Sequence, residues 1–292
     1  MSEDGRFAIV VIALLGNPFS PAYARQRLLA ERAGTKSPAA LSFSSLNVAL
    51  YGPDRKLWAL TETAIGEDAR TSTGVRIGRS AMQWTNDELR VDVDETCAPL
   101  GRRIRGTVRI LPECEPGVGI ALDPRGAHMW WPVAPLSRIE VALDDPGIRF
   151  SGHGYHDANA GDEPLPAAFS RWTWSRARLK NKSIVTYDTE LCSGRRMGRA
   201  LAISSRGDVT ELLDLPAGPL PTTRWGLPRS GRGDGPTVRR SLEDTPFYAR
   251  AMIESEYQGE RVVAMHEELS CERLSAAWVR FLLGFRMRRR AA

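Results

Sequence analysis

Hydrophobic and polar residues alternate along much of this chain with the two-residue period of half-buried β-strands. Leu89, Val91 and Val93 alternate with charged residues, and Ile139, Val141 and Leu143 repeat the pattern. Apolar or β-branched runs bounded by Gly, Pro, Asp or Ser predict four further strands, at Phe7–Leu15, Leu46–Leu50, Arg199–Ile203 and Arg261–Met265. Many short strands at close spacing predict an all-β barrel or sandwich. No G-x-G-x-x-G turn supports a dinucleotide-binding fold.

Two segments carry helix signals instead. Ser20 and Pro21 are a capping residue and a first-position proline, so we expect a helix over Ala22–Ala33 that ends at Gly34. The second helix is expected over Glu272–Met287, where one apolar face comprises Leu274, Ala277, Trp278, Phe281, Leu282 and Phe285. This short C-terminal helix has two interpretations: it closes a barrel and leaves a solvated arginine tail, or it holds the protein on a membrane surface.

The length of 292 residues fits one large domain or two ordinary ones. An acidic turn with a proline, Asp144–Gly147, predicts a boundary between two strand-rich halves, residues 1–145 and 146–292. The Pro- and Gly-rich stretch Leu215–Pro236 is expected to be an inter-strand loop or lid.

Composition and charge narrow the class of protein further. With 42% hydrophobic and 26% charged residues, the chain has the composition of a folded protein. Four arginines at the C-terminal end supply four of the five net positive charges, so the rest is near neutral and we expect no nucleic-acid partner. No apolar run reaches the roughly 18 residues of a membrane span. The acidic start lacks a signal-peptide cleavage site, which predicts a cytoplasmic protein.

Candidate chemistry is concentrated in the middle of the chain, where three of the four histidines lie between positions 128 and 156. If residues 149–157 form a strand, Tyr155 and Asp157 share a face, and by the same count His128 and Trp130 share one. A three-residue offset on a strand sends His153 and His156 to opposite sides, so no metal site is expected. No G-x-S-x-G elbow supports a serine hydrolase. These residues alone leave the function open, because Asp157 could cap a turn and Trp130 could be a core residue.

An ordered set of passages nevertheless points to one family. The chain resembles the carotenoid 1,2-hydratase (hydroxyneurosporene synthase) family of phototrophic and other carotenoid-making bacteria. The passages that carry the resemblance run in order along the chain: Ser45-Leu-Asn-Val-Ala-Leu-Tyr-Gly-Pro53, Trp58-Ala-Leu-Thr-Glu62, Gly152-His-Gly-Tyr-His-Asp-Ala-Asn-Ala-Gly-Asp-Glu-Pro164, Trp172-Thr-Trp-Ser-Arg176, Leu242-Glu-Asp-Thr-Pro-Phe-Tyr-Ala-Arg250 and Trp278 to Arg288.

This resemblance implies two lipocalin-like β-barrel domains and the addition of water across the terminal C1=C2 double bond of acyclic carotenes such as neurosporene or lycopene. It implies no redox cofactor, and a location on the inner or intracytoplasmic membrane, where such a substrate resides. Family members carry an additional aromatic-rich stretch upstream of Asp4–Arg6. We therefore expect either that an edge strand of the first barrel is missing or that the natural start lies upstream.

The site residues implied by the resemblance are His128 and Trp130, from His-x-Trp, and Tyr155 and Asp157, from Gly-Tyr-x-Asp. Asp157 is expected to protonate C2, with Tyr155 positioning its carboxyl group. Trp130 would stabilise the resulting cation, and His128 would orient or deprotonate the attacking water. Two alternatives from other classes are a carotenoid or lipid carrier and a polyene cyclase built on the same barrel.

Overall fold

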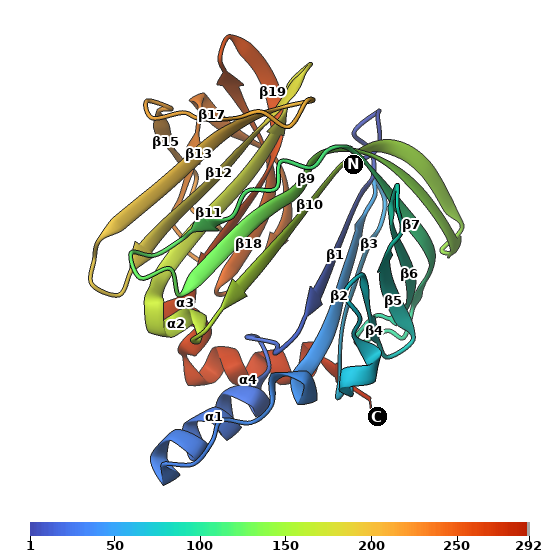
Figure 1. The fold of residues 1–292 in the computed structure, drawn as a ribbon, viewed down its shortest axis with the longest axis vertical. Helices are drawn as coiled ribbons and strands as arrows, with labels where there is room; N and C mark the ends of the chain where they lie inside the picture. The colour runs from blue at the N-terminus through green and yellow to red at the C-terminus, as the bar shows by residue number, and fades with distance from the viewer. Residues whose placement is uncertain (291–292) are drawn as a thin grey trace. The chain divides into compact units, whose positions relative to one another are not determined.

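The computed structural model describes residues 1–290 and is mostly β-structure (Figure 1). It contains two compact units. Unit 1 comprises Met1–Leu111, Arg138–Gly154 and the stretch from Arg280, and unit 2 comprises Pro112–Ser137 and Tyr155–Val279.

The expected division at residue 145 stays a prediction. That position is the turn between two long strands, β9 (His128–Asp145) and β10 (Ile148–Gly161), and it lies inside unit 1. Strands β9 and β10 each contribute residues to both units.

Unit 1 is built on two sheets. A four-stranded sheet has the order β1-β2-β3-β20, with bounds β1 (Ala8–Leu14), β2 (Ser44–Tyr51), β3 (Lys56–Thr63) and β20 (Arg288–Arg289). A larger sheet has the order β10-β9-β7-β6-β5-β4, with β8 paired to β9; its other strands are β4 (Gly74–Ile77), β5 (Ser80–Trp84), β6 (Leu89–Thr96), β7 (Arg103–Cys114) and β8 (Ile120–Ala121). Strand β8, residues 128–137 of β9 and residues 155–161 of β10 belong to unit 2. Short 3-10 turns lie at Ala40–Phe43 and Glu67–Ala69.

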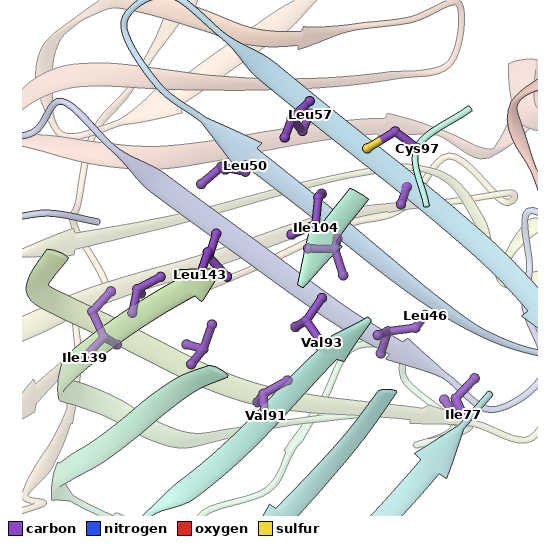
Figure 2. Close-up of a cluster of buried hydrophobic side chains, with 14 of the residues drawn as sticks. Leu46, Leu50, Leu57, Ile77, Val91, Val93, Cys97, Ile104, Ile139 and Leu143 are labelled. Carbon is purple, nitrogen blue, oxygen red and sulfur yellow. The ribbon is translucent and has the colours of Figure 1, made fainter. Parts of the chain in front are cut away.

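The core of unit 1 follows directly from the alternating pattern. In β6, Leu89, Val91 and Val93 are buried while the residues between them are not, as the two-residue period predicts. Figure 2 shows these valines in one apolar cluster with residues of other strands, namely Leu46, Leu50, Leu57, Ile104, Ile139 and Leu143.

Unit 2 is organised around a seven-stranded antiparallel sheet. Its order is β14-β13-β12-β11-β19-β18-β17, with bounds β11 (Phe169–Arg178), β12 (Lys182–Leu191), β13 (Arg196–Ser204), β14 (Val209–Glu211), β17 (Asp234–Asp244), β18 (Tyr248–Tyr257) and β19 (Glu260–Ser270). One face carries an apolar cluster that includes Ala177, Ile184 and Ala264. The residues between these on the same strands project from the opposite face, which carries the candidate site.

Sequence signals located several of these elements correctly. All six predicted strands are present, and the all-β class is confirmed. The stretch 215–236 is not simply a loop, because it contains a two-stranded sheet of β15 (Ala217–Leu220) and β16 (Arg229–Arg232). No closed barrel is detected in residues 1–290, where each sheet is an open row of strands. The lipocalin-like character of the fold stays a prediction of the family resemblance.

The first helix, α1 (Pro21–Ala33), is confirmed together with its boundaries. The Ser20 hydroxyl oxygen accepts a hydrogen bond from the Tyr23 backbone N–H at 3.1 Å, and Pro21 takes a first-turn position that needs no donor. Gly34 ends the helix at φ 62, a left-handed conformation that favours glycine. A one-turn helix, α2 (Leu165–Ala168), follows β10.

The C-terminal helix departs from its prediction. It is two helices, α3 (Cys271–Ser275) and α4 (Ala277–Arg286), separated by Ala276 in an extended conformation. This break changes the helical phase, so the buried apolar residues are Leu274, Val279 and Leu283. Four members of the predicted apolar face are exposed: Trp278, Phe281, Leu282 and Phe285.

The arginine tail is not simply solvated either. Arg289 donates to Glu62 at 2.6 Å, and the Arg286 guanidinium lies 4.8 Å from the centre of the Trp58 ring. Backbone pairing of β20 with β3 holds the same segment against the four-stranded sheet.

Candidate active site

The two pairs of site residues expected from the sequence lie on β9 and β10. A turn before β9 is fixed by Asp123, whose carboxylate accepts backbone N–H bonds from Arg125 and His128 at 2.8 and 2.7 Å. From there, His128 and Trp130 are both buried and Met129 between them is not, so the two share the buried face of the strand.

Three of the four expected residues form one hydrogen-bonded group. Both the Trp130 indole N–H and the Tyr155 hydroxyl donate to Oδ2 of Asp157, each at 3.0 Å. Because the two donors converge on one oxygen, Oδ1 of Asp157 is the carboxyl oxygen without a side-chain donor among residues 1–290.

Aromatic rings from the sheet of unit 2 surround this group. The Tyr155 ring lies 5.1 Å from that of Trp174 on β11, and the Trp130 ring lies 5.5 Å from that of Tyr187 on β12. Trp174 and Tyr187 are directly opposite in the β11–β12 register, so they share a face of the sheet. The result is an acidic group held among four aromatic side chains.

This environment changes the acidity of the carboxyl group. Burial raises the pKa of Asp157 to about 6 against an ordinary 3.8, although the hydrogen bonds from Trp130 and Tyr155 oppose the rise. Burial also raises the pKa of Tyr155 and of Tyr187 well above 10, with the Asp157 charge acting in the same direction. Both phenols therefore remain protonated near neutral pH.

His128 lies in different surroundings from this group. Its ring is 4.7 Å from that of Phe169, and its Nε2 is 3.9 Å from Glu163. A Cβ at position 161 would overlap the imidazole, so Gly161 permits its close approach to β10. Burial lowers the pKa of His128, and within the described part of the chain Nε2 has no hydrogen-bond partner. The structure thus joins Trp130, Tyr155 and Asp157 directly but does not hydrogen-bond His128 to them.

The other two histidines of the central segment lie on β10. Burial lowers the pKa of His156 to about 4. Among residues 1–290, no group of three or more His, Cys, Asp or Glu side chains is placed to hold a metal ion.

The site also contains residues that sequence reasoning missed. Trp174 belongs to the alternating Trp172-x-Trp174 pattern of β11, a signal that could have found it. For Tyr187 the only sequence signal is its place in the alternating pattern of β12. Two further charged residues, the buried Arg250 on β18 and the half-buried Glu267 on β19, form an ion pair of 2.7 Å. Their sequence context is that of exposed strand residues, so only the strand register shows where they lie.

Known proteins resemble this chain over nearly its whole length. The profile of the carotenoid hydratase CrtC family matches residues 11–292. The acyclic carotenoid 1,2-hydratase of Thiocapsa roseopersicina is 40% identical over 293 residues, covering 99% of this chain and 71% of that protein. The Rubrivivax gelatinosus protein of the same name is 40% identical, covering 100% of this chain and 72% of its own, and that of Rhodobacter capsulatus is 32% identical, covering 96% and 98%.

Solved structures of low sequence similarity share the fold. An AttH-like protein from Nitrosomonas europaea superimposes with a TM-score of 0.56 at 13% identity, over 78% of this chain and 81% of that one. CghA with Sch210972 superimposes with a TM-score of 0.55 at 10% identity, over 78% and 80%. At such identities these matches bear on the fold alone.

Fold and site together define an all-β protein that holds a carboxyl group of raised pKa among aromatic side chains. The family match identifies it further: the chain belongs to the carotenoid hydratase CrtC family and, as a member, is a hydro-lyase. The resemblance identified from its sequence is thereby confirmed. No described helix is long and apolar enough to cross a bilayer.

Proposed function

We propose that this enzyme adds water across the terminal C1=C2 double bond of acyclic carotenes such as neurosporene or lycopene, giving 1-hydroxy carotenoids. The relatives named acyclic carotenoid 1,2-hydratase support the reaction class. The observation that carries the proposal is the Asp157 carboxyl group, held by two donors on one oxygen in an aromatic environment. Addition of water involves no net oxidation or reduction, so the reaction needs no redox cofactor.

Asp157 is the proposed proton donor. Hydration of an isolated alkene requires protonation of C2, which leaves a tertiary cation at C1. With a pKa of about 6, about one Asp157 in ten is protonated at pH 7, against about one in a thousand for an ordinary aspartate. Since Trp130 and Tyr155 both donate to Oδ2, that oxygen is held as an acceptor and the acidic proton belongs on Oδ1.

Aromatic side chains are the proposed partners of the cation. The Trp130 N–H lies in the plane of its ring, so the edge of the indole faces Asp157 and its hydrogen bond orients the carboxyl group. The rings of Trp130, Trp174 and Tyr187 supply negative π-faces close to the acid. Such contacts contribute about 0.5–2 kcal/mol, so they assist the acid but cannot replace it.

Water must lose a proton as it adds to C1, and two groups are candidates to accept that proton. His128 is the residue expected from the sequence, and its lowered pKa keeps it neutral at pH 7 and able to accept a proton. Glu267 is the second, because it shares a sheet face with Trp174.

Incubation with lycopene or neurosporene, followed by mass measurement of the extracted pigment, tests the reaction. Hydration adds the mass of one water per end, whereas a carrier leaves the pigment unchanged and a cyclase yields an isomer of equal mass. Asp157→Asn is expected to abolish hydration, while Asp214→Asn, at an exposed aspartate, is the matched control. Hydration by Asp157→Asn at the parental rate would remove the assignment of the acid.

We also propose that the enzyme works as a peripheral protein on the cytoplasmic side of the inner or intracytoplasmic membrane. Helix α4 exposes Phe281 and Phe285, which are 67% and 66% accessible and pack edge to face at 5.0 Å. Exposed arginines follow at positions 286 and 289. Aromatic side chains beside cationic ones suit the interface of an anionic bilayer, where each cation contributes about 1 kcal/mol.

Co-sedimentation with vesicles tests this location. Binding to vesicles rich in phosphatidylglycerol should exceed binding to phosphatidylcholine vesicles, and the double variant Phe281→Ser, Phe285→Ser should lose most of it. Leu213→Ser, at a site 80% exposed and remote from α4 in sequence, is the control and should bind like the parent. Equal binding by the double variant and the control would contradict the role of α4.

A further inference from the structure

The sheet of unit 2 places a second carboxyl group on the same face as the aromatic residues around Asp157. In the strand register, Glu267 on β19 lies directly opposite Trp174 on β11, which in turn lies opposite Tyr187 on β12. Residues directly opposite in antiparallel strands project from the same face. Because the Trp174 ring lies 5.1 Å from that of Tyr155, one row of side chains connects Glu267 to the residues that hold Asp157.

Electrostatics agree with this placement. The charge of Glu267 acts on both Asp157 and Tyr187, disfavouring a second negative charge on either. The two carboxyl groups therefore lie close enough for the charge of Glu267 to act on Asp157.

Glu267 is held in position by a buried arginine. The Arg250 Nε donates to Oε1 of Glu267 at 2.7 Å, and the side chains of the two residues are 2% and 15% exposed. Arg250 is also directly opposite Glu267 in the β18–β19 register, and its guanidinium lies 5.4 Å from the centre of the Tyr248 ring. This charge-assisted hydrogen bond fixes the orientation of the Glu267 carboxyl group. This bond engages Oε1, so we assign the proton-accepting role to the other carboxylate oxygen, Oε2.

We propose that the Glu267 carboxylate is a catalytic base, which accepts the proton released when water adds to the cation generated by Asp157; this rests on the proposed function. In the first step the Asp157 O–H bond breaks and the alkene electron pair forms the C2–H bond, leaving the cation at C1. In the second step a water lone pair forms the C1–O bond, and one water O–H proton passes to Oε2 of Glu267. Return of that proton to Asp157 through solvent restores both groups, and the net change is one alkene plus one water to one tertiary alcohol.

The contacts of His128 favour Glu267 for this step. His128 contacts Phe169 and Glu163 and hydrogen-bonds to none of the three residues around the acid, whereas Glu267 is next to Trp174. A carboxyl group that donates a proton and a carboxylate that accepts one together provide both proton transfers of a hydration.

The neighbouring residue, Glu268, provides a matched control. It is buried, bonded to Arg171 at 2.8 Å and to the Thr173 hydroxyl at 2.8 Å, and it projects from the opposite face of the same strand. Glu267→Gln and Glu268→Gln therefore replace the same functional group at adjacent positions of one strand. In each case the amide oxygen can still accept from the arginine, and thermal unfolding followed by circular dichroism verifies that both variants fold.

The experiment is lycopene hydration in buffered D2O, with mass analysis of both the product and the recovered substrate. Glu267→Gln should reduce hydration by about 100-fold or more, the usual effect of losing a general base. Its cation should still form and revert to alkene, so the recovered lycopene should gain deuterium. Asp157→Asn should show neither hydration nor deuterium uptake, and Glu268→Gln should hydrate within about tenfold of the parent.

Two results would overturn the proposal. One is hydration by Glu267→Gln within about threefold of the parent, which is less than a general base contributes. The other is a folded Glu267→Gln that loses deuterium uptake together with hydration. That result would mean that the Glu267 carboxylate is needed before the cation forms. Failure of the parent to hydrate lycopene or neurosporene would instead refute the proposed function, so the two failures are distinguishable.

Discussion

Asp157→Asn should change the pH dependence of stability as well as abolish activity. Burial raises the pKa of Asp157 to about 6 in the folded protein, above the ordinary value of 3.8 that applies when the chain is unfolded. The folded state therefore binds this proton more tightly than the unfolded state does. Its contribution to stability is complete below pH 3.8 and is lost as the pH rises through about 6. An asparagine has no such dependence.

The size of the effect follows from the two pKa values. A shift of one pKa unit corresponds to about 1.4 kcal/mol, so the change from 3.8 to about 6 costs the folded parent about 3 kcal/mol once both states are ionised. At pH 5 the unfolded chain is mostly ionised and the folded chain mostly is not, and about half of that cost is already present. The difference in free energy of unfolding, variant minus parent, should therefore rise by about 1.4 kcal/mol between pH 5 and pH 8.

Urea denaturation of both proteins at pH 5, 6, 7 and 8 measures this difference. Other titrating groups, such as Glu268, whose pKa burial raises to about 7, are present in both proteins and largely cancel. Equal slopes in urea are needed for the comparison. A difference that stays constant from pH 5 to pH 8, or that falls, would refute the raised pKa and with it the basis for assigning Asp157 as the acid.

Three further substitutions test two hydrogen bonds to Asp157 and the cap of α1. Trp130→Phe keeps an aromatic face, so activity should fall without vanishing. The substitution also removes a hydrogen bond that lowers the pKa of Asp157, so the alkaline limb of the pH–rate profile should move above pH 6. An alkaline limb that stays in place would contradict the role of this hydrogen bond. Tyr155→Phe should move the same limb in the same direction, since its hydroxyl also donates to Oδ2. Ser20→Ala removes the cap of α1 and should lower the local stability of that helix by about 1 kcal/mol, seen as faster hydrogen exchange of its first-turn amides, with the exposed Ser205→Ala as control.

Local pattern was sufficient for most of the secondary structure of this chain. The alternation in β6 and the cap and stop residues of α1 are decided by neighbours a few positions away, so their boundaries were predictable. The C-terminal helix was predicted as one helix but is two, because a single extended residue, Ala276, interrupts it. The hairpin of β15 and β16 was missed, since Gly and Pro dominate its composition and tertiary pairing decides its conformation.

Local spacing likewise predicted some features of the candidate site and could not predict others. Spacing on one strand predicted that Tyr155 and Asp157 share a face, and the structure shows both in one hydrogen-bonded group. Spacing could not show that Trp130 donates to the same oxygen, because that contact joins residues 27 positions apart. Glu267 is further still from Asp157 along the chain, and only the pairing of β11 with β19 places it near Trp174.

The surroundings of Asp157 balance two requirements of an acid catalyst. Burial raises its pKa and so increases the protonated fraction at pH 7, but a higher pKa also makes each protonated molecule a weaker acid. Hydrogen bonds from Trp130 and Tyr155 act in the opposite direction, and because both reach Oδ2 they limit the rise while fixing which oxygen carries the proton. A second carboxylate held by Arg250 then favours the neutral acid without donating to it. The resulting pKa of about 6 lies close to neutral pH, where a general acid is most effective. Removing the hydrogen bond from Trp130 or Tyr155 should raise the pKa of Asp157, and removing the charge of Glu267 should lower it.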